Sequence, residues 1–377
     1  MDSSSLGFLL VLALAFANGT NDVSKAIATL VGSGVTNYRS AIAWGAVWTM
    51  AGAFASGLVA TAMVKTFSTG LLRTQLEIPP AVSLSVISGA MAWVLIASRT
   101  GLPVSTTHAL TGGIIGAGLI AFGTQGIVWP GIAGKILLPL VLSPVLALIL
   151  SVALHPIVRS LIGRWEGACL CFMPAQRALV RVTAQGATRT LFQTSVFGHP
   201  VAAVPERCDR AGLRGLTIGP DTIHWASSGL ASLARGTNDA PKIMAMLLLG
   251  GMASAWTAPT SQAAALIGVA IAMGLGSFLG GLRVTEVLAE KVTRMNHIEG
   301  LSANLTTSSL VLVSATLGLP VSTTHVSSSA IIGIGVLKGL TAVRWTTVRD
   351  MVLAWVMTLP AAGILACLAY LTLTRIP

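Results

Sequence analysis

Charged side chains are scarce in this chain. Asp, Glu, Lys and Arg make up 9% of its 377 residues, whereas a soluble globular domain carries about 25%. Hydrophobic residues make up 54%, and the mean hydropathy is +0.81. So few charges cannot cover a water-exposed surface, which excludes a soluble domain as the main part of the chain. The composition predicts a polytopic membrane protein.

Long apolar runs recur from one end of the chain to the other, and many could cross a hydrocarbon core of about 30 Å. They cover residues 6–31, 41–64, 81–98, 102–122, 131–154, 223–251, 258–282, 300–317, 318–337 and 351–373. A transmembrane β-barrel would instead show alternating segments of about ten residues. Because several runs contain polar breaks, we expect an all-α membrane protein with about 10–12 membrane segments.

Cysteine and nucleotide-binding motifs are also scarce or missing. Three of the four cysteines (Cys169, Cys171 and Cys208) fall in one polar connection, and their spacing is not that of a zinc site. The sequence has no G-x-x-x-x-G-K-[ST] loop for ATP and no G-x-S-x-G nucleophile elbow. We therefore expect no resident cofactor, no ATP-driven pumping by this chain and no enzymatic activity.

The net charge of +11 is concentrated in one segment. Residues 155–222 hold eight Arg against four acidic residues. An excess of Arg in a loop places it on the cytoplasmic side, and without interleaved aromatic residues it is no platform for nucleic acid. The sequence predicts three parts: an N-terminal membrane repeat (1–154), an Arg-rich cytoplasmic loop (155–222) and a C-terminal membrane repeat (223–377).

Two motifs occur twice with a common spacing. Asp22 and Asp239 each end a copy of G-T-N-D, and Thr107 and Thr324 lie in identical copies of G-L-P-V-S-T-T-H. The interval from Asp22 to Asp239 along the chain equals the interval from Thr107 to Thr324. A shared offset indicates a duplicated unit. An odd number of crossings in each unit would make the repeats inverted.

Both motifs place polar residues inside apolar sequence. Backbone that leaves the helix within a membrane is costly unless it lines a cavity or a ligand site. Gly19 and Gly236 are expected to permit such a departure, and Pro103 and Pro320 to lie in the first turn of a new helix. The sequence thus predicts broken helices.

The hydroxyl groups that follow each proline are candidate anion ligands. At a helix N-terminus, free N–H groups and the helix dipole both favour negative charge. Paired half-helices near the bilayer midplane are typical of secondary transporters. The candidate residues are Ser105, Thr106, Thr107, Ser322, Thr323 and Thr324.

The two aspartates need a separate explanation, because a carboxylate repels a bound anion. Either Na⁺ is held by Asp22 or Asp239 with the amide oxygens of Asn21 or Asn238, or the substrate donates its own proton to the carboxylate. Both alternatives couple anion uptake to positive charge. A passive oxyanion channel is a rival, although an anion pore gains nothing from buried carboxylates.

The paired G-T-N-D and P-V-S-T-T-H segments resemble those of the inorganic phosphate transporter (PiT) family, which also includes bacterial sulfate permeases. The resemblance implies Na⁺- or H⁺-driven symport of phosphate, or of sulfate, by a multi-pass protein of the cell (inner or plasma) membrane. It also implies a homodimer and a cytoplasmic central loop. The family's anion and cation ligands map onto Asn21, Asp22, Ser105, Thr106 and Thr107, and onto Asn238, Asp239, Ser322, Thr323 and Thr324.

One departure from the family pattern concerns the coupling ion. The fuller signature, G-A-N-D-V-A-N-A, has a second Asn where this chain has Lys25 and Lys242. A Lys three residues after Asp shares its helical face, and its ammonium could replace a bound cation or assist the anion. A partner elsewhere in the protein is the alternative. His108 and His325 are secondary candidates, either as proton relays or as packing residues.

Overall fold

The structure is a computed structural model that describes residues 2–59, 61–73, 77–163, 169–173, 177–184, 187–194, 199–203, 219–252 and 259–375. The first repeat contains α1 (Ser3–Asp22), α2 (Ser24–Gly32), α3 (Tyr38–Val59), α4 (Thr61–Thr69), α5 (Pro80–Thr100), α6 (Thr106–Phe122), η1 (Thr124–Gly126), α7 (Trp129–Gly131), the π-helical η2 (Ile132–Leu137) and α8 (Leu138–Ile162). The second contains α10 (Pro220–Leu249), α11 (Pro259–Gly280), α12 (Leu282–Glu290), α13 (His297–Thr316), α14 (Thr323–Leu337), η5 (Leu340–Ala342) and α15 (Trp345–Leu373).

Equivalent helices keep the offset that separates the two motif copies. The start of α10 follows the start of α1 by this offset, and its end follows the end of α2 by the same offset. Helices α13 and α14 start at the same offset from α5 and α6. The packing is duplicated as well: α1 packs on α11 as α10 packs on α3, and α6 on α15 as α14 on α8. The chain therefore consists of two similar units related by a pseudo-two-fold axis. Helices of one unit pack against helices of the other in equivalent pairs.

The two units run in opposite directions. Helices α3 and α11 are equivalent, and Gly57 near the end of α3 faces Leu266 near the start of α11, whereas Gly274 further along α11 faces Met50. The contacts thus pair the end of one helix with the start of the other. Equivalent helices that pack antiparallel make the repeats inverted, as predicted.

Apolar side chains cover the outside of the helical bundle, and its interior combines a large apolar core with buried polar residues. Exposed large hydrophobic residues include Val141 and Ile149 on α8 and Val356 and Ile364 on α15, each more than half exposed. Five described helical segments are long and apolar enough to cross a membrane, or six if the bent α3–α4 pair is one span. The shorter α6 and α14, with 17 and 15 residues, match the expected broken helices.

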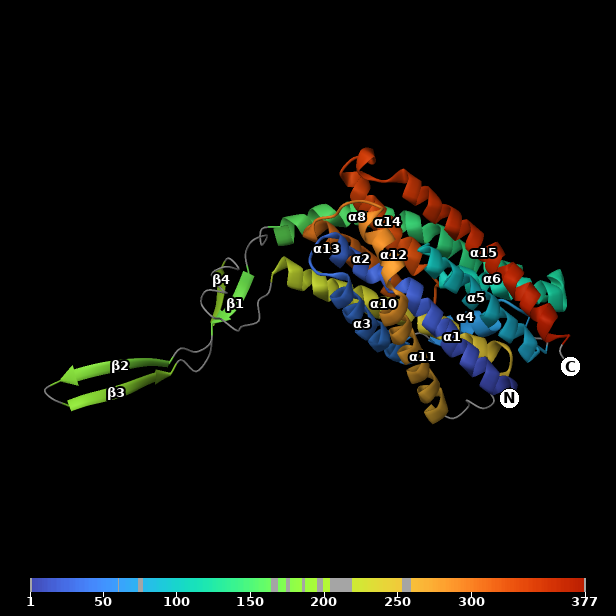
Figure 1. The fold of residues 1–377 in the computed structure, drawn as a ribbon, viewed down its shortest axis with the longest axis horizontal. Coiled ribbons are helices and arrows are strands. Elements are labelled where there is room, and N and C mark those ends of the chain that lie inside the picture. Colours follow the sequence, from blue (N-terminus) through green and yellow to red (C-terminus); the bar gives the residue numbers. More distant parts are fainter. Residues whose placement is uncertain are drawn as a thin grey trace.

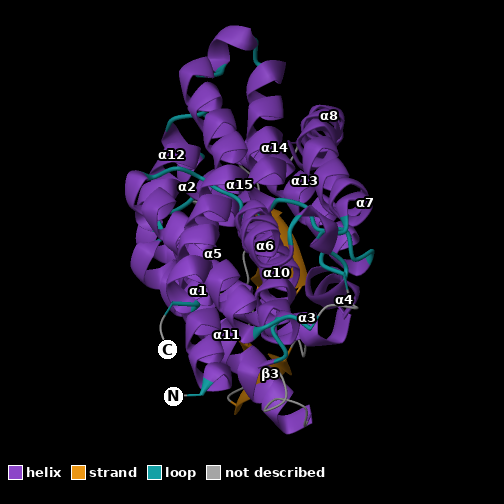
Figure 2. Ribbon diagram, turned by 90° about the vertical axis from the view of Figure 1, so that its right-hand side faces the viewer, coloured by secondary structure: helices purple, strands orange, loops and turns teal. Residues whose placement is uncertain are grey.

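Both chain termini lie at one end of the helical bundle, and the central connection lies at the other (Figure 1). Viewed along the bundle, α10 and α6 lie among the surrounding helices (Figure 2). The connection is not only loop: α8 continues to Ile162, and four strands follow. They are β1 (Cys169–Met173), β2 (Arg177–Ala184), β3 (Ala187–Thr194) and β4 (His199–Ala203).

The strands form two antiparallel pairs, β1 with β4 and β2 with β3. These strands were not predicted, because the charge of the segment had indicated a loop. The side chains of Cys169 and Cys171, and the whole of Cys208, lie outside the described residues.

The prediction for Gly19 and Gly236 was wrong. The helix is continuous through Gly236, and α1 passes Gly19 and meets α2 at Val23, whose backbone angles are helical (φ −58°, ψ −35°). A Cβ on Gly19 would lie 2.2 Å from the carbonyl oxygen of Met273, and one on Gly236 would lie 2.2 Å from that of Thr49. These glycines permit close helix packing.

The prediction for Pro103 and Pro320 was wrong in position. Helices α6 and α14 begin at Thr106 and Thr323, after the serines that cap them. Both prolines therefore precede the cap in non-helical segments. Because a proline disfavours helical geometry in the residue before it, the two rings separate the preceding helix from the next rather than start the next.

Adding a methyl group at Gly52 is expected to destabilise the bundle. A Cβ there would lie 2.0 Å from the carbonyl oxygen of Leu233, so α3 and α10 must separate. We expect Gly52→Ala to lower the free energy of unfolding by about 1–3 kcal/mol, measured as a lower thermal midpoint in detergent. Gly134→Ala is the matched control, because among the described residues no atom outside its own stretch of helix lies within 4 Å of the added Cβ. Equal midpoints for the two variants would contradict the close packing.

Candidate functional site

The two aspartates meet at the centre of the bundle. Asp22 ends α1, Asp239 lies in α10, and each is at most 2% exposed. The amide nitrogen of Asn18 lies 3.0 Å from Asp22 Oδ2 and 3.2 Å from Asp239 Oδ2, and it also lies 2.9 Å from Thr106 Oγ1. One amide group therefore links both repeats and the start of α6.

Each aspartate is paired with the lysine that follows it by three residues. Lys25 donates to Asp22 Oδ1, and Lys242 Nζ lies 3.2 Å from Asp239 Oδ1. Both lysines are buried. A buried ion pair is stable only when further hydrogen bonds satisfy its charges, and these lysines have them.

The further partners of the lysines come from the first turn of α6 and from the segments before α6 and α14. Lys25 Nζ donates to the carbonyl of Val104 (2.9 Å), and Lys242 Nζ donates to Thr107 Oγ1 (2.8 Å) and to the carbonyl of Val321 (3.3 Å). Each ammonium thus contacts a carboxylate oxygen and a backbone carbonyl. Oxygen-only surroundings of this kind are also what a bound hard cation prefers.

The serines of the two P-V-S-T-T-H motifs cap the half-helices. Ser105 Oγ accepts from the backbone N–H of His108 (3.3 Å), and Ser322 Oγ accepts from that of His325 (3.2 Å). Serine is a preferred cap because its hydroxyl satisfies an N–H group that the helix leaves free. These two oxygens orient the helix ends that point into the site.

The second threonine of each motif crosses to the other repeat. Thr107 Oγ1 donates to the carbonyl of Val321 (3.4 Å), and Thr324 Oγ1 donates to that of Val104 (2.6 Å). These are equivalent bonds in opposite directions, so the two half-helix starts hold one another. Thr106 and Thr323, the first residues of α6 and α14, are buried beside them.

The two asparagines of G-T-N-D have different contacts. Asn21 Oδ1 accepts from the N–H of Val104 (3.1 Å), and its amide nitrogen donates to the carbonyl of Leu102 (3.0 Å), so Asn21 fixes the segment before α6. The amide nitrogen of Asn238 donates to Asp239 and Val321. Asn238 Oδ1 and Asn18 Oδ1 are buried and accept no hydrogen bond from the described residues.

These two free amide oxygens are candidate ligands for a sodium ion. A hard cation would find neutral oxygens at Asn18 and Asn238, but the carboxylate beside each already faces a lysine ammonium. Among the described residues, no group of three or more His, Cys, Asp or Glu comes together to hold a metal ion.

The two histidines face each other across the pseudo-two-fold axis. Their ring centroids are 4.7 Å apart, and the His325 ring lies 4.2 Å from that of Trp355. His325 Nδ1 lies 3.2 Å from the carbonyl of Leu140, while His108 Nδ1 and His325 Nε2 have no partner in the described part of the chain. The hydrogen bond of His325 to Leu140 and its ring contact with Trp355 fit a packing residue, and the proton-relay alternative stays a prediction.

Sequence reasoning missed Asn18 and Arg235, which occupy the same position in the two repeats, directly before G-T-N-D. Arg235 is 1% exposed and its Nη2 donates to Thr49 Oγ1 (2.6 Å) and Ser277 Oγ (3.2 Å). Aligning the two repeats with each other would have revealed both residues. Where the motifs are otherwise equal, one repeat has an amide and the other a fixed positive charge.

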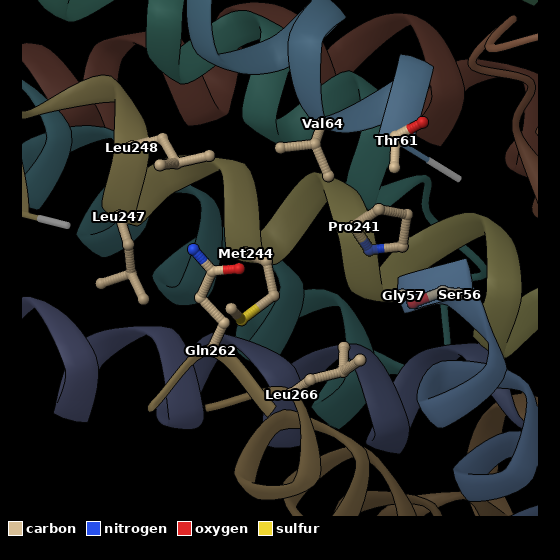
Figure 3. Close-up of a pocket in the computed structure, with 10 residues that line it drawn as sticks. All are labelled: Ser56, Gly57, Thr61, Val64, Pro241, Met244, Leu247, Leu248, Gln262 and Leu266. Carbon is tan, nitrogen blue, oxygen red and sulfur yellow. The ribbon is translucent and has the colours of Figure 1, made fainter. Parts of the chain in front are cut away.

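The apolar pocket drawn in Figure 3 lies apart from these groups. Its lining comes from α3, α4, α10 and α11, and it includes Ser56, Val64, Met244 and Leu266. None of the described residues that line it is charged. The lining is mostly apolar, and its polar side chains are Ser56, Thr61 and Gln262.

The sequence of this chain was compared with known protein families. The family model described as "Phosphate transporter family" matches residues 18–366. This chain belongs to the phosphate transporter family. Because the family consists of transporters, the prediction that the chain is not an enzyme is confirmed, as is the resemblance drawn from the four motif copies.

Individual proteins that are similar to this transporter are also described as phosphate transporters. The "Probable low-affinity inorganic phosphate transporter" of Mycobacterium bovis is 32% identical over 362 residues, which covers 95% of this chain and 75% of that protein. The protein of the same description from Bacillus subtilis is 30% identical over 371 residues and covers 97% and 95%. A solved structure described as "The sodium-dependent phosphate transporter" has a TM-score of 0.76 at 22% identity, over 100% of both chains, and shows the same fold.

Proposed function

We propose that this transporter carries inorganic phosphate across the cell membrane by symport with a cation. The observation that carries the proposal is the meeting of two half-helix N-termini, Ser105–Thr107 and Ser322–Thr324, with two buried Asp–Lys pairs. Half-helix N-termini attract an oxyanion. The carboxylates supply the acceptors that a co-transported cation or proton requires.

The surroundings of the lysines favour H⁺ over Na⁺ as the coupling cation. Each ammonium already occupies an oxygen-lined position beside a carboxylate, so a second cation there would be repelled. A phosphate that carries its own proton can donate it to Asp22 or Asp239 as a hydrogen bond. If Na⁺ is used, the free oxygens of Asn18 and Asn238 would hold it, and it would neutralise charge during the crossing.

The orientation of the chain follows from its charges. Both termini lie at the opposite end of the bundle from the 155–222 connection (Figure 1). The eight Arg of that connection support a cytoplasmic location, which would leave both termini outside. We also propose a homodimer, because exposed apolar faces such as that of α8 suit helix contacts in lipid as well as lipid itself.

Uptake into proteoliposomes tests the proposed function. We expect radiolabelled phosphate to accumulate when the lumen is alkaline relative to the medium, with little added effect from a Na⁺ gradient. Sulfate, which carries no proton at neutral pH, should be taken up more slowly, because a site built for a donor penalises an anion that lacks one. Equal, gradient-independent fluxes of both anions would instead identify a channel, and faster sulfate uptake a sulfate permease.

A further inference from the structure

Two exposed arginines lie where the end of α5 meets the start of α12. Arg99 is in the last turn of α5, and Arg283 is the second residue of α12, which follows the apolar α11. Nη1 of Arg283 donates to the backbone carbonyl of Arg99 (2.6 Å). This bond satisfies one of the carbonyls that the end of a helix leaves free, and it holds the guanidinium of Arg283 beside α5.

The bond to Arg99 leaves the bidentate edge of Arg283 available. Nε–H lies beside Nη2, and together they form the edge with which a guanidinium binds two oxygens of one phosphate or carboxylate. Within the described part of the chain, Nε and Nη2 of Arg283 have no hydrogen-bond partner, and neither has the side chain of Arg99. No ion pair among the described residues includes either arginine.

Both arginines line a cleft on the surface of the bundle, called here the arginine cleft. Its volume is about 540 Å³, within the range of about 300–1,000 Å³ that is typical of small-molecule sites. Its other large side chains are apolar, and Leu279 and Leu282 are 70% and 46% exposed. The arginine cleft therefore combines two positive charges with an apolar surface that continues onto the outside of the bundle.

No carboxylate of the described chain completes the arginine cleft. Glu286 and Glu290 follow Arg283 on α12, but neither lines the cleft, and Glu290 accepts a hydrogen bond from Tyr38 at the start of α3. A charged side chain beside hydrocarbon is costly unless a counter-charge or water reaches it. The two guanidinium groups thus require an anion that these residues do not supply.

The arginine cleft lies at the end of a membrane span. Helix α11 has 22 residues, which is about 33 Å and close to the thickness of the hydrocarbon core. Gly268 near its start faces Phe8, and Gly280 at its end faces Thr20, so α1 and α11 run in the same direction. The end of α11 therefore lies away from the chain termini (Figure 1). In the proposed orientation this end faces the cytoplasmic leaflet.

The corresponding corner of the second repeat carries no charge. The offset that relates the repeats takes Arg99 to Thr316. Gly318, which follows α13, faces Ala62 of α4, as Gly101 after α5 faces α12. The positive charge is therefore confined to one of the two related corners, at one end of the bundle, and it is not a consequence of the duplicated packing.

The inner wall of the arginine cleft is connected to the site of the two aspartates. Thr20 and Ser98 line the cleft, and Thr20 Oγ1 donates to Ser98 Oγ (2.9 Å). The amide nitrogen of Asn21 also donates to Ser98 Oγ (3.2 Å). The side chains of Asp22 and Lys25 do not line the cleft. The two sites are thus separate, although they share the end of α5 as a common wall.

We propose that the arginine cleft binds the headgroup of an anionic phospholipid. The headgroup phosphate accepts from Nε and Nη2 of Arg283 and from the guanidinium of Arg99, and an acyl chain lies along Leu279 and Leu282. A lipid fits better than a free anion, because the apolar part of the cleft is open to the bilayer. The bound lipid joins α5 to α12. This site is additional to the proposed transport function and does not depend on it.

Binding of phosphatidylglycerol to the full-length protein in detergent tests the proposal, with the Kd measured by native mass spectrometry in the absence of phosphate. We expect Arg99→Gln/Arg283→Gln to raise the Kd by about 10–100-fold, the effect of losing several charge-assisted hydrogen bonds. Arg39→Gln/Arg294→Gln is the matched control, because it removes two exposed arginines that do not line the cleft. Its Kd should stay within about threefold of wild type.

Two further ligands identify the source of the phosphate group. Phosphatidylcholine with the same acyl chains should bind more weakly, because its headgroup carries its own positive charge. Millimolar inorganic phosphate should not displace phosphatidylglycerol, because it has no acyl chain to occupy the apolar part of the cleft. Displacement by inorganic phosphate would identify an anion site and overturn the lipid assignment, as would equal Kd values for the two lipids.

An unchanged Kd for phosphatidylglycerol in Arg99→Gln/Arg283→Gln would also overturn the proposal. If that variant does not fold, the single variants Arg99→Gln and Arg283→Gln decide, and unchanged Kd values in both would contradict it. Wild-type protein that binds no phosphatidylglycerol would contradict it as well and would leave this face to a second copy of the chain. Because none of these measurements requires transport, a failure of phosphate uptake would defeat only the proposed function.

Discussion

Asp22→Asn and Asp239→Asn are each expected to abolish gradient-driven phosphate uptake, lowering the initial rate by about 100-fold. Each change leaves a buried lysine without its carboxylate, at a cost of about 3–5 kcal/mol, and removes the acceptor for the co-transported charge. The measurement is radiolabelled phosphate uptake into proteoliposomes under a pH gradient. The thermal midpoint of each variant is recorded beside it.

Double variants separate coupling from charge balance. Asp22→Asn/Lys25→Asn and Asp239→Asn/Lys242→Asn remove both members of a pair, so neither pair leaves a buried charge behind. If the aspartate only neutralises the lysine, the double variant should recover uptake. We expect instead that stability recovers and coupled uptake does not. Undiminished transport in the single variants would remove both aspartates from the mechanism.

Lys25→Asn/Lys242→Asn is expected to make phosphate uptake depend on sodium by at least about tenfold. Without the ammonium groups, Asp22 Oδ1 and the carbonyl of Val104 lose their cation, as do Asp239 Oδ1, Thr107 Oγ1 and the carbonyl of Val321. These all-oxygen groups suit a hard cation, and the unpaired carboxylates require one. The variant also restores the second Asn of the family signature.

The comparison is uptake in Na⁺ against uptake in choline at a fixed pH gradient. Wild-type protein should show little difference between the two media, and the double variant should transport only in Na⁺. Lys338→Asn is a useful control, because it removes a lysine that pairs with Glu299 away from the two aspartates. Equal rates in both media for the Lys25/Lys242 variant would contradict the view that the lysines replace bound cations.

Much of the fold was predictable because the duplication is visible in the sequence as two motifs that recur at one offset. The common offset of the two motifs appears again in the starts of α10, α13 and α14. The half-helices were predictable from proline and serine, whose effects are local: proline disfavours a helix in the residue before it and serine caps the next one. Local residue preferences predicted the structure less well where contacts between helices determine the role of a residue. The glycines of G-T-N-D looked like breaks and proved to be points of helix contact, since a missing Cβ serves both purposes equally well.

The candidate site divides in the same way. Sequence spacing made pairing of Lys25 and Lys242 with the aspartates one of two alternatives, because residues three apart share a helical face, and the structure shows both pairs. Contacts between helices could not be read from spacing. They include the bridge from Asn18 to Asp239, the crossed bonds of Thr107 and Thr324, and the approach of His108 to His325.

The sequence by itself determined that the chain lies in a membrane, that it is duplicated, which residue types form the site and which family it resembles. A chain with so few charged residues and so many apolar ones is suited to a bilayer. The offset between repeated motifs can be read from the sequence without any knowledge of the tertiary structure. Only the tertiary structure decided which groups of the described chain lack a partner. Arg235 is an ordinary arginine in the sequence, and only the fold shows that it is buried, that its Nη2 donates to Thr49 and Ser277, and that its Nε and Nη1 have no partner among the described residues. Whether a charge is satisfied depends on what surrounds it, and those neighbours come from helices far apart in the chain.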